Sequence, residues 1–358
     1  MKILGIETSC DETAAAVVEL LDPAQGARLL SNEVASSMDL HAKYGGVIPE
    51  IAARSHIEAI IPVIQQALED AKCGWSDIDA IAVTYGAGLG GSLLIGVLTA
   101  RTLAITHRKP LFACNHVVGH VYANFISSTS LPGYEVPQAV PQFPMLAVIV
   151  SGGHSQLALF RNHFDYTLLG QTHDDAIGEA FDKVGKLLGL PYPAGPNVAK
   201  LASQGDDHAF PLPKAKMGEK YDFSFSGLKT AVLRQAQAEI GEDYTFPSIK
   251  LPERLSEAQK ANIAATFQCI AVDTIVDKAL LAVQEFSPAS VVVAGGVAAN
   301  SELRRQLTEK LPLPTLFPDL KLCTDNGAMI ATLGAYMSTH EQPVADPYTL
   351  DIEPNLSM

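Results

Sequence analysis

Two histidines at helical spacing are the first residues that could do chemistry. His116 and His120 lie four positions apart at a helix predicted over residues 117–126, so both imidazoles would project from one face of the helix. Such a pair can share a metal ion, although two histidines that pack in a half-buried helix give the same pattern. A metal would need a third ligand, and Asp325 is a candidate because it stands in a turn before a predicted helix. An ordinary helix N-cap is the alternative role for that aspartate.

The same pair argues against protease chemistry. A zinc protease needs a glutamate directly after the first histidine as its general base, and Val117 occupies that position. No nucleophile–base pair of another protease class can be identified either.

Glycine-rich turns in the second half of the chain are candidates for phosphate binding. Ser151-Gly152-Gly153 follows a predicted strand, where small residues can expose successive backbone N–H groups to an anion. A tight hairpin turn explains the same residues equally well. Gly295-Gly296 forms a similar turn before Asn300, which could cap a helix or hold a ribose or phosphate. Two such turns in one half favour a nucleotide cleft.

A third glycine-rich segment, residues 86–91, formally matches the dinucleotide-binding fingerprint. That fingerprint requires an acidic residue about 20 positions later, to bind the ribose. No Asp or Glu occurs between Asp79 and Glu135, so we reject this interpretation. The same acid-free stretch is locally basic, with Arg101, Arg108 and Lys109.

Three carboxylates and one loop glycine complete the candidates. Asp11 and Glu12 stand in the first polar turn, and Asp182 lies on an otherwise apolar helix where it either faces a cleft or belongs to a plain surface. Gly195 lies in a proline-rich loop, where it permits close approach of a ligand or simply makes a turn.

The elements that must position these residues alternate between strand and helix patterns. A strand, a polar turn and a second strand occur at Lys2 and again at Met145, which indicates a duplicated unit. We therefore expect an α/β fold with mixed sheets, and a linker over residues 127–144.

Composition sets the class of protein. A chain of 358 residues suggests two domains, and 47% hydrophobic against 18% charged residues excludes general disorder. No apolar run approaches the roughly 18 residues of a membrane span, and the first residues do not look like a signal peptide. We therefore expect no membrane partner. Five scattered cysteines argue against a disulfide framework, so we expect a protein of the reducing cytoplasm. The net charge of −14 argues against whole-surface attraction to nucleic acid.

In combination the motifs resemble the TsaD family of tRNA N6-adenosine threonylcarbamoyltransferases. The resemblance rests on segments spread over almost the whole chain, namely residues 6–13 (IETSCDET), 45–50 (GGVIPE), 116–120 (HVVGH), 150–154 (VSGGH), 179–183 (EAFDK), 223–229 (FSFSGLK) and 323–328 (CTDNGA). One departure is Ala194, which stands where the family usually has a glycine.

The resemblance implies an actin-like ATPase (ASKHA, ribonuclease H-like) duplicated fold, with two lobes around a nucleotide cleft. The first lobe would span residues 1–130. The second would span residues 144–325, with an insertion near 203–255. The final helix, about 326–340, would pack back on the first lobe.

The resemblance also implies a reaction. The N6 amine of the adenosine beside the anticodon, in tRNAs that read codons starting with A, attacks threonylcarbamoyl-AMP, and AMP leaves. His116, His120 and Asp325 would bind one iron (Fe²⁺) or zinc ion. The donor would contact Ile149, Val150, Ser151, Gly152, Gly153, Asp182, Gly195 and Asn300. Asp11 would be a catalytic or positioning carboxylate.

The implied partners are tRNA, the paralogue TsaB as a heterodimer, and the ATPase TsaE. Because the chain is acidic, either local basic residues or these proteins must supply positive charge for tRNA. The local candidates are Arg101, Arg108, Lys109, Lys214, Lys216, Lys220, Arg304 and Arg305. Two alternatives remain open: a small-molecule kinase of the same fold, and a non-catalytic scaffold paralogue.

Overall fold

A computed structural model describes residues 1–215 and 217–358. Lys216, one of the candidate lysines above, lies outside the described residues. The chain divides into two compact units: unit 1 contains residues 1–141 and 316–358, and unit 2 contains residues 142–315. Each unit is built on one mixed sheet with helices packed against it, which confirms the expected α/β class.

The sheet of unit 1 has six strands in the order β5-β4-β1-β2-β3-β6. β1 runs antiparallel to β2 and parallel to β4. The centres of β1 and β2 are wholly apolar and fully buried, as expected for strands covered on both faces. The bounds are β1 Lys2–Glu7, β2 Glu12–Glu19, β3 Ala27–Ser36, β4 Ala80–Gly86, β5 Leu111–Asn115 and β6 Ile126–Thr129.

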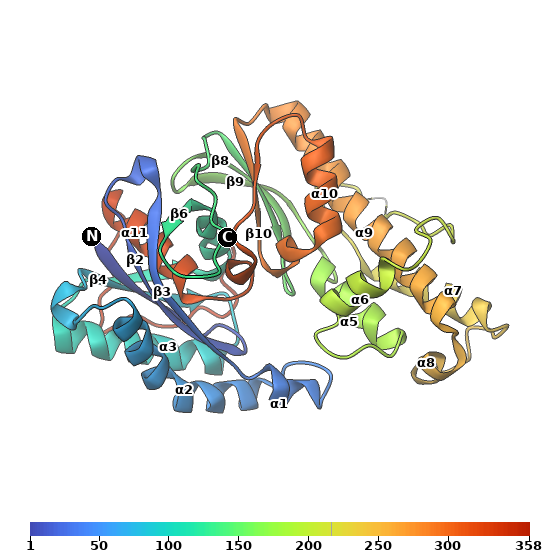
Figure 1. Cartoon of the computed structure of the whole chain (residues 1–358), viewed down its shortest axis with the longest axis horizontal. Coiled ribbons are helices and arrows are strands. Elements are labelled where there is room, and N and C mark those ends of the chain that lie inside the picture. The colour runs from blue at the N-terminus through green and yellow to red at the C-terminus, as the bar shows by residue number, and fades with distance from the viewer. Residues whose placement is uncertain (216) are drawn as a thin grey trace. The chain divides into compact units, whose positions relative to one another are not determined.

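Helices cover both faces of this sheet (Figure 1). α2 (Pro49–Asp70) and α3 (Gly90–His107) pack on the face that carries Leu4 and Ile6. α11 (Gly327–Thr339) packs on the other face, where Gly5 lets the helix approach closely. A Cβ on Gly5 would lie only 2.3 Å from the carbonyl oxygen of Gly327. The remaining helices of unit 1 are α1 Met38–Ala42 and α4 His116–Tyr122.

The structure corrects one predicted boundary. The helical pattern that the sequence shows up to Ile126 ends earlier, because α4 stops at Tyr122 and a 3₁₀ turn, Ala123–Phe125, leads into β6. β6 then pairs in parallel with the edge strand β3, so the expected linker begins within a strand. An edge strand can recruit a short, weakly patterned segment through backbone hydrogen bonds alone.

The sheet of unit 2 repeats the order of unit 1. Its strands run β11-β10-β7-β8-β9, which matches β5-β4-β1-β2-β3 position by position, with an antiparallel hairpin beside a parallel neighbour in each. The predicted duplication is therefore confirmed. The bounds are β7 Met145–Val150, β8 Ser155–Asn162, β9 Asp165–Gln171, β10 Ser290–Ala294 and β11 Thr315–Leu316.

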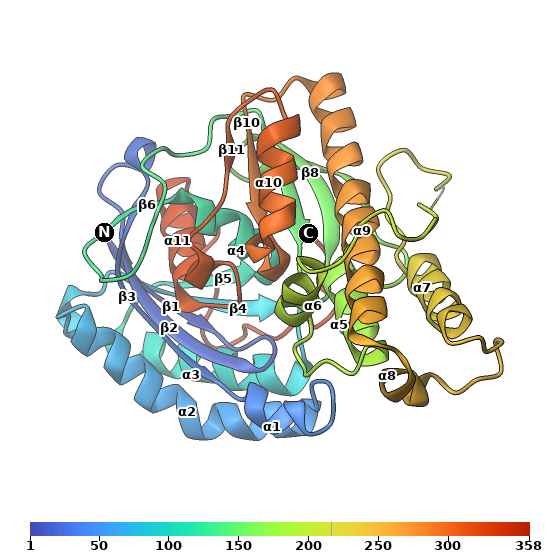
Figure 2. The same cartoon turned by 45° about the vertical axis from the view of Figure 1, so that its right-hand side comes forward.

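The helices of unit 2 gather around the long helix α9, Glu257–Phe286 (Figure 2). Ser256 caps α9 in a reciprocal capping box with Gln259. The segment predicted as a proline-rich loop already contains the start of α6, because Pro196 is tolerated in a first turn. The other bounds are α5 Ile177–Leu187, α6 Gly195–Ala202, α7 Ser226–Glu239, α8 Leu251–Arg254 and α10 Ser301–Lys310.

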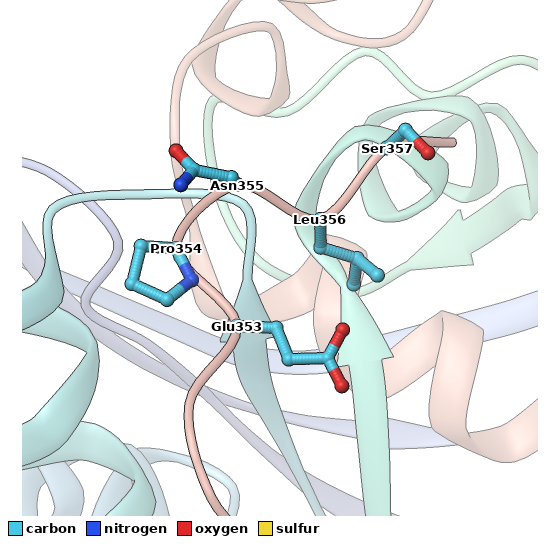
Figure 3. A pocket seen from close by; sticks show the side chains of 5 residues that line it. All are labelled: Glu353, Pro354, Asn355, Leu356 and Ser357. Carbon is cyan, nitrogen blue, oxygen red and sulfur yellow. The ribbon is translucent and has the colours of Figure 1, made fainter.

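The C-terminal segment after α11 is held against unit 1. The guanidinium group of Arg101 donates to the carbonyl oxygens of Pro347, Tyr348 and Leu350 at 2.6, 2.6 and 3.0 Å. Further along, residues 353–357 line an open pocket of about 420 Å³ (Figure 3). Within the described part of the chain, no helix is both long and apolar enough to cross a membrane.

Candidate metal centre

α4 carries both histidines and begins at the first of them. Asn115 caps the helix, since its side-chain oxygen accepts hydrogen bonds from the N–H groups of Val117 and Val118. The four-residue spacing places the imidazoles of His116 and His120 on one face, with ring centroids 4.8 Å apart. Both residues are buried. The sequence-based placement of this pair is thus confirmed.

Asp325 joins the two histidines from the turn before α11. Asn326, rather than Asp325, caps that helix by accepting from the N–H of Met329, so the N-cap alternative for Asp325 is wrong. Asp325 Oδ1 lies 3.1 Å from His120 Nε2 and 3.6 Å from His116 Nε2. One ligand atom from each residue falls within 4.8 Å of the others. Two imidazole nitrogens and a carboxylate oxygen are typical ligands of zinc and of iron.

The hydrogen bonding of His120 supports a cation at this point. Among the described residues, neither ring nitrogen of His120 has a hydrogen-bond partner of acceptable geometry, despite the short distance to Asp325. Buried polar atoms without partners are rare and costly in folded proteins. A cation bound at Nε2 would satisfy one of them, so these three residues are compatible with a metal ion.

Buried carboxylates make the centre electronegative. Burial lowers the pKa of His116, but the charges of Asp325 and Glu7 outweigh it and raise that pKa to about 9. Burial opposes ionisation of Glu7, yet attraction to His116 and hydrogen bonds hold its pKa below the ordinary value. Burial, with the charges of Asp325 and Asp11, raises the pKa of Glu12 to about 10. A site that stabilises an imidazolium so strongly would also favour a metal cation.

The β1–β2 turn that carries Asp11 is held through its carbonyl groups. The carbonyl oxygen of Cys10 accepts from Ser92 Oγ at 3.1 Å and lies 3.0 Å from His56 Nε2. The carbonyl of Asp11 accepts from both the N–H and the hydroxyl of Ser37. Asp11 itself is only 9% exposed.

Two residues of the centre were not singled out from the sequence: Glu7 and Ser9. Glu7 Oε2 lies 3.3 Å and Ser9 Oγ lies 3.1 Å from His116 Nδ1. One signal was available, because Glu7 is an acidic residue that follows the apolar residues 3–6 in the same strand. Its partner could not be identified without the sheet order.

In unit 2 the predicted donor-binding turn joins β7 to β8. Ile149 and Val150 end β7, and Ser151 closes the turn through hydrogen bonds with His154. Space is open beside Gly152 and Gly153, since a Cβ on either would meet nothing within 4 Å. The turn also lies against neighbouring backbone, because a Cβ on Gly178 or Gly295 would clash with the carbonyl of Ser151 or Val150.

Two other predicted donor-binding residues have structural partners. Asp182 Oδ1 accepts from the N–H of Ala194 at 2.7 Å, which ties α5 to the start of α6 at Gly195. Asn300 caps α10 by accepting from Leu303, and its amide nitrogen donates to Gln268. Gly195 has open space beside it.

Several of the basic residues singled out above have acidic neighbours. Lys214 pairs with Asp273 and Asp277, and Arg305 pairs with Glu302 and Glu309. Arg101 donates its hydrogen bonds to carbonyl oxygens of the C-terminal segment, as described above. These contacts reduce the positive charge that the same side chains could present to an external anion.

A second group of possible ligands occurs in unit 2: Asp207, His208 and Cys269. The side chains of Asp207 and His208 are 58% and 83% exposed, so water competes for them directly. The group fits a resident metal less well than the buried centre on α4.

The paired sheets define the class of the protein, the actin-like ATPase fold. A solved structure with this architecture, full-length HypF in the phosphate- and nucleotide-bound form, matches 94% of this chain and 46% of its own with a TM-score of 0.56. Because the sequence identity is only 14%, this similarity supports the fold and not a shared activity.

The sequence comparisons identify the family. The profile of TsaD, tRNA N6-adenosine threonylcarbamoyltransferase, matches residues 28–332. A protein of that name from Thermomicrobium roseum is 49% identical over 100% of this chain and 97% of its own length. A namesake from Dehalococcoides mccartyi is 45% identical over 100% and 99%. The chain belongs to the TsaD family.

Proposed function

We propose that this chain transfers the threonylcarbamoyl group from threonylcarbamoyl-AMP to N6 of the adenosine next to the anticodon, in tRNAs that read codons starting with A. Family membership implies the tRNA substrate and the transferase class. The observation that carries the proposal is the buried cluster of His116, His120 and Asp325 in a chain with these relatives. In the reaction, a bond forms between N6 and the carbamoyl carbon, the bond from that carbon to the phosphate oxygen breaks, and AMP leaves.

His116, His120 and Asp325 would bind the metal, which we propose is iron (Fe²⁺) or zinc. When bound, such a cation can polarise the carbonyl of the donor or hold its phosphate. The chain holds the three ligands by fixing both ends of the cluster: Asn115 starts α4, and Asn326 starts α11 beside Asp325.

The proposed donor site consists of Ile149, Val150, Ser151, Gly152, Gly153, Asp182, Gly195 and Asn300. Its support is the open backbone at Gly152, Gly153 and Gly195, where N–H groups can approach a phosphate without steric hindrance. Asp182 and Asn300 would contact the nucleotide portion of the donor. Their hydrogen bonds to the start of α6 and of α10 hold both side chains in place.

We propose Asp11 as a catalytic or positioning carboxylate. The fixed carbonyls of its turn limit its movement, and its charge contributes to the raised pKa of Glu12.

The proposed protein partners are TsaB, which would form a heterodimer with this chain, and TsaE. The proposed location of the complex is the cytoplasm. Exposed apolar side chains on two packed helices support a protein partner. Ile57 and Ile61 of α2 are 61% and 49% exposed, and Leu94 and Leu98 of α3 are 40% and 45% exposed. Large exposed apolar patches mark interaction surfaces.

The test is nucleoside mass spectrometry of unmodified tRNA after incubation with threonylcarbamoyl-AMP, this chain and its cognate partners. We expect threonylcarbamoyladenosine with the wild type, and its loss with His116→Ala and Asp325→Ala. His208→Ala is the matched control, since this exposed histidine belongs to the other ligand group. Absence of product from folded, metal-loaded protein would refute the assignment, and phosphorylation of a small molecule would favour the kinase alternative instead.

A further inference from the structure

Glu7 is a buried carboxyl group in the core of unit 1, at the end of β1 and directly after the apolar residues 3–6. Its exposed fraction is 0%. A buried carboxylate is tolerated only when charges and hydrogen bonds compensate for the lost hydration. Glu7 has three donors: the N–H of Ser9 at 2.5 Å to Oε1, and Thr84 Oγ1 at 2.5 Å and His116 Nδ1 at 3.3 Å to Oε2. An apolar residue would need none of them.

The contact with Glu7 decides which nitrogen of His116 is available. Both oxygens of the Glu7 carboxyl group already accept hydrogen bonds, so the contact with His116 places a proton on Nδ1, and Ser9 Oγ lies within reach of the same N–H at 3.1 Å. In a neutral ring the lone pair is then on Nε2. Nε2 is also the nitrogen that faces Asp325, at 3.6 Å.

The two histidines of α4 differ in this respect. Neither nitrogen of His120 has a hydrogen-bond partner among the described residues, whereas His116 is oriented through Nδ1. Metal-binding histidines usually donate their second N–H to a carboxylate or carbonyl, which fixes the tautomer and makes the ligating nitrogen more basic. The geometry around Glu7 and His116 has this form.

We propose that Glu7 is a positioning residue for the metal centre: it holds His116 with Nε2 directed to the cation, and through the N–H of Ser9 it connects that histidine to the turn that carries Asp11. This inference rests on the proposed metal site. It goes beyond that site by adding a residue that would act on the cation through His116.

The experiment compares Glu7→Gln with wild type by metal affinity, measured in competition with a chromogenic chelator for Zn²⁺, and by the visible absorption of the Co²⁺ form. We expect Glu7→Gln to weaken Zn²⁺ binding by roughly 10- to 100-fold and to change the Co²⁺ spectrum. Thr84→Val is the matched control, because it removes another donor from the same carboxylate and leaves the contact with His116. We expect its affinity within about threefold of wild type.

Affinity and spectrum of Glu7→Gln equal to those of wild type would overturn the proposal. If Glu7→Gln does not fold, nitrogen NMR of the wild-type zinc form decides: His116 must show a protonated Nδ1 and a metal-bound Nε2, and the reverse pattern would refute the role of Glu7. Wild-type protein that binds no metal would refute the metal site and this inference together. Wild-type protein that binds Zn²⁺ but does not modify tRNA would refute only the proposed transferase, while the affinity comparison still decides the role of Glu7.

Discussion

His56 Nε2 lies 3.0 Å from the carbonyl oxygen of Cys10, and His56 Nδ1 lies 2.7 Å from Thr13 Oγ1. Because a carbonyl only accepts, Nε2 must carry a proton, and in the neutral ring Nδ1 accepts from the hydroxyl of Thr13. A fully buried histidine therefore connects α2 to residues on either side of Asp11, one in the turn and one in β2.

This arrangement predicts a pH-dependent stability. Burial lowers the pKa of His56 below its ordinary value of 6.5, and the hydrogen bond to Cys10 opposes this only in part. Below pH 6.5 the unfolded chain binds a proton that the folded chain resists, so the free energy of unfolding is greatest above that pH and falls as the pH decreases.

Urea unfolding of wild type and His56→Gln at about pH 8 and about pH 5.5 measures this contribution. The glutamine can donate and accept but does not titrate in this range, so we expect the loss of stability on acidification to be smaller in the variant. His208→Gln, at an exposed position, should lose as much as wild type. An equal acid loss in wild type and His56→Gln would contradict the assignment.

Arg101 should be important for stability. Replacing it with alanine leaves the carbonyls of Pro347, Tyr348 and Leu350 without their donor, at an expected cost of about 2 kcal/mol in the free energy of unfolding. Limited proteolysis should cut residues 346–358 faster in Arg101→Ala. Lysine should restore only part of the stability, since it lacks the planar set of donors.

Arg161→Ala is the control for this measurement. Its side chain is 53% exposed and pairs with the exposed Asp165, so the change should stay within about 0.5 kcal/mol. A similarly small effect for Arg101→Ala would show that the C-terminal segment is held by other contacts.

Substitution by alanine should destabilise the fold at Gly5 and leave its stability unchanged at Gly153. A Cβ at Gly5 would lie 2.3 Å from backbone atoms of both Gly327 and Ala331, and backbone cannot move aside as a flexible side chain can. We expect Gly5→Ala to lower the free energy of unfolding by about 3 kcal/mol or to prevent folding. A Cβ at Gly153 would have no neighbouring atom within 4 Å, so the midpoint of thermal unfolding of Gly153→Ala should equal that of wild type.

The second variant also tests the donor-binding turn. If AMP binds over Gly153, calorimetry should show weaker AMP binding by Gly153→Ala despite its unchanged stability. Unchanged AMP affinity would argue against this turn as the phosphate site.

If the proposed heterodimer with the paralogue TsaB forms, the exposed apolar side chains of α2 and α3 should be required for it. Ile61→Arg introduces a charge at an exposed apolar position, so we expect it to abolish co-elution with the paralogue in size-exclusion chromatography. Leu320→Arg is the control, because Leu320 is 60% exposed but lies outside α2 and α3. Loss of the complex in both variants would indicate general damage instead of a specific surface.

Features that depend on local spacing could be predicted from the amino-acid sequence. The interval between His116 and His120 placed two imidazoles on one face, because a helix returns to the same side after four residues. The repeated strand–turn–strand pattern at Lys2 and Met145 likewise predicted two related sheets, which have the same strand order.

The residues that surround the metal centre could be identified only from the folded chain. Glu7 belongs to β1, His116 to α4, and Asp325 to the turn before α11, and the sheet order and the packing of α11 bring them together. Local patterns carry no information on such contacts, because a strand's neighbours depend on the packing of the whole unit. For the same reason Asp325 had two possible roles until Asn326 was found to cap α11.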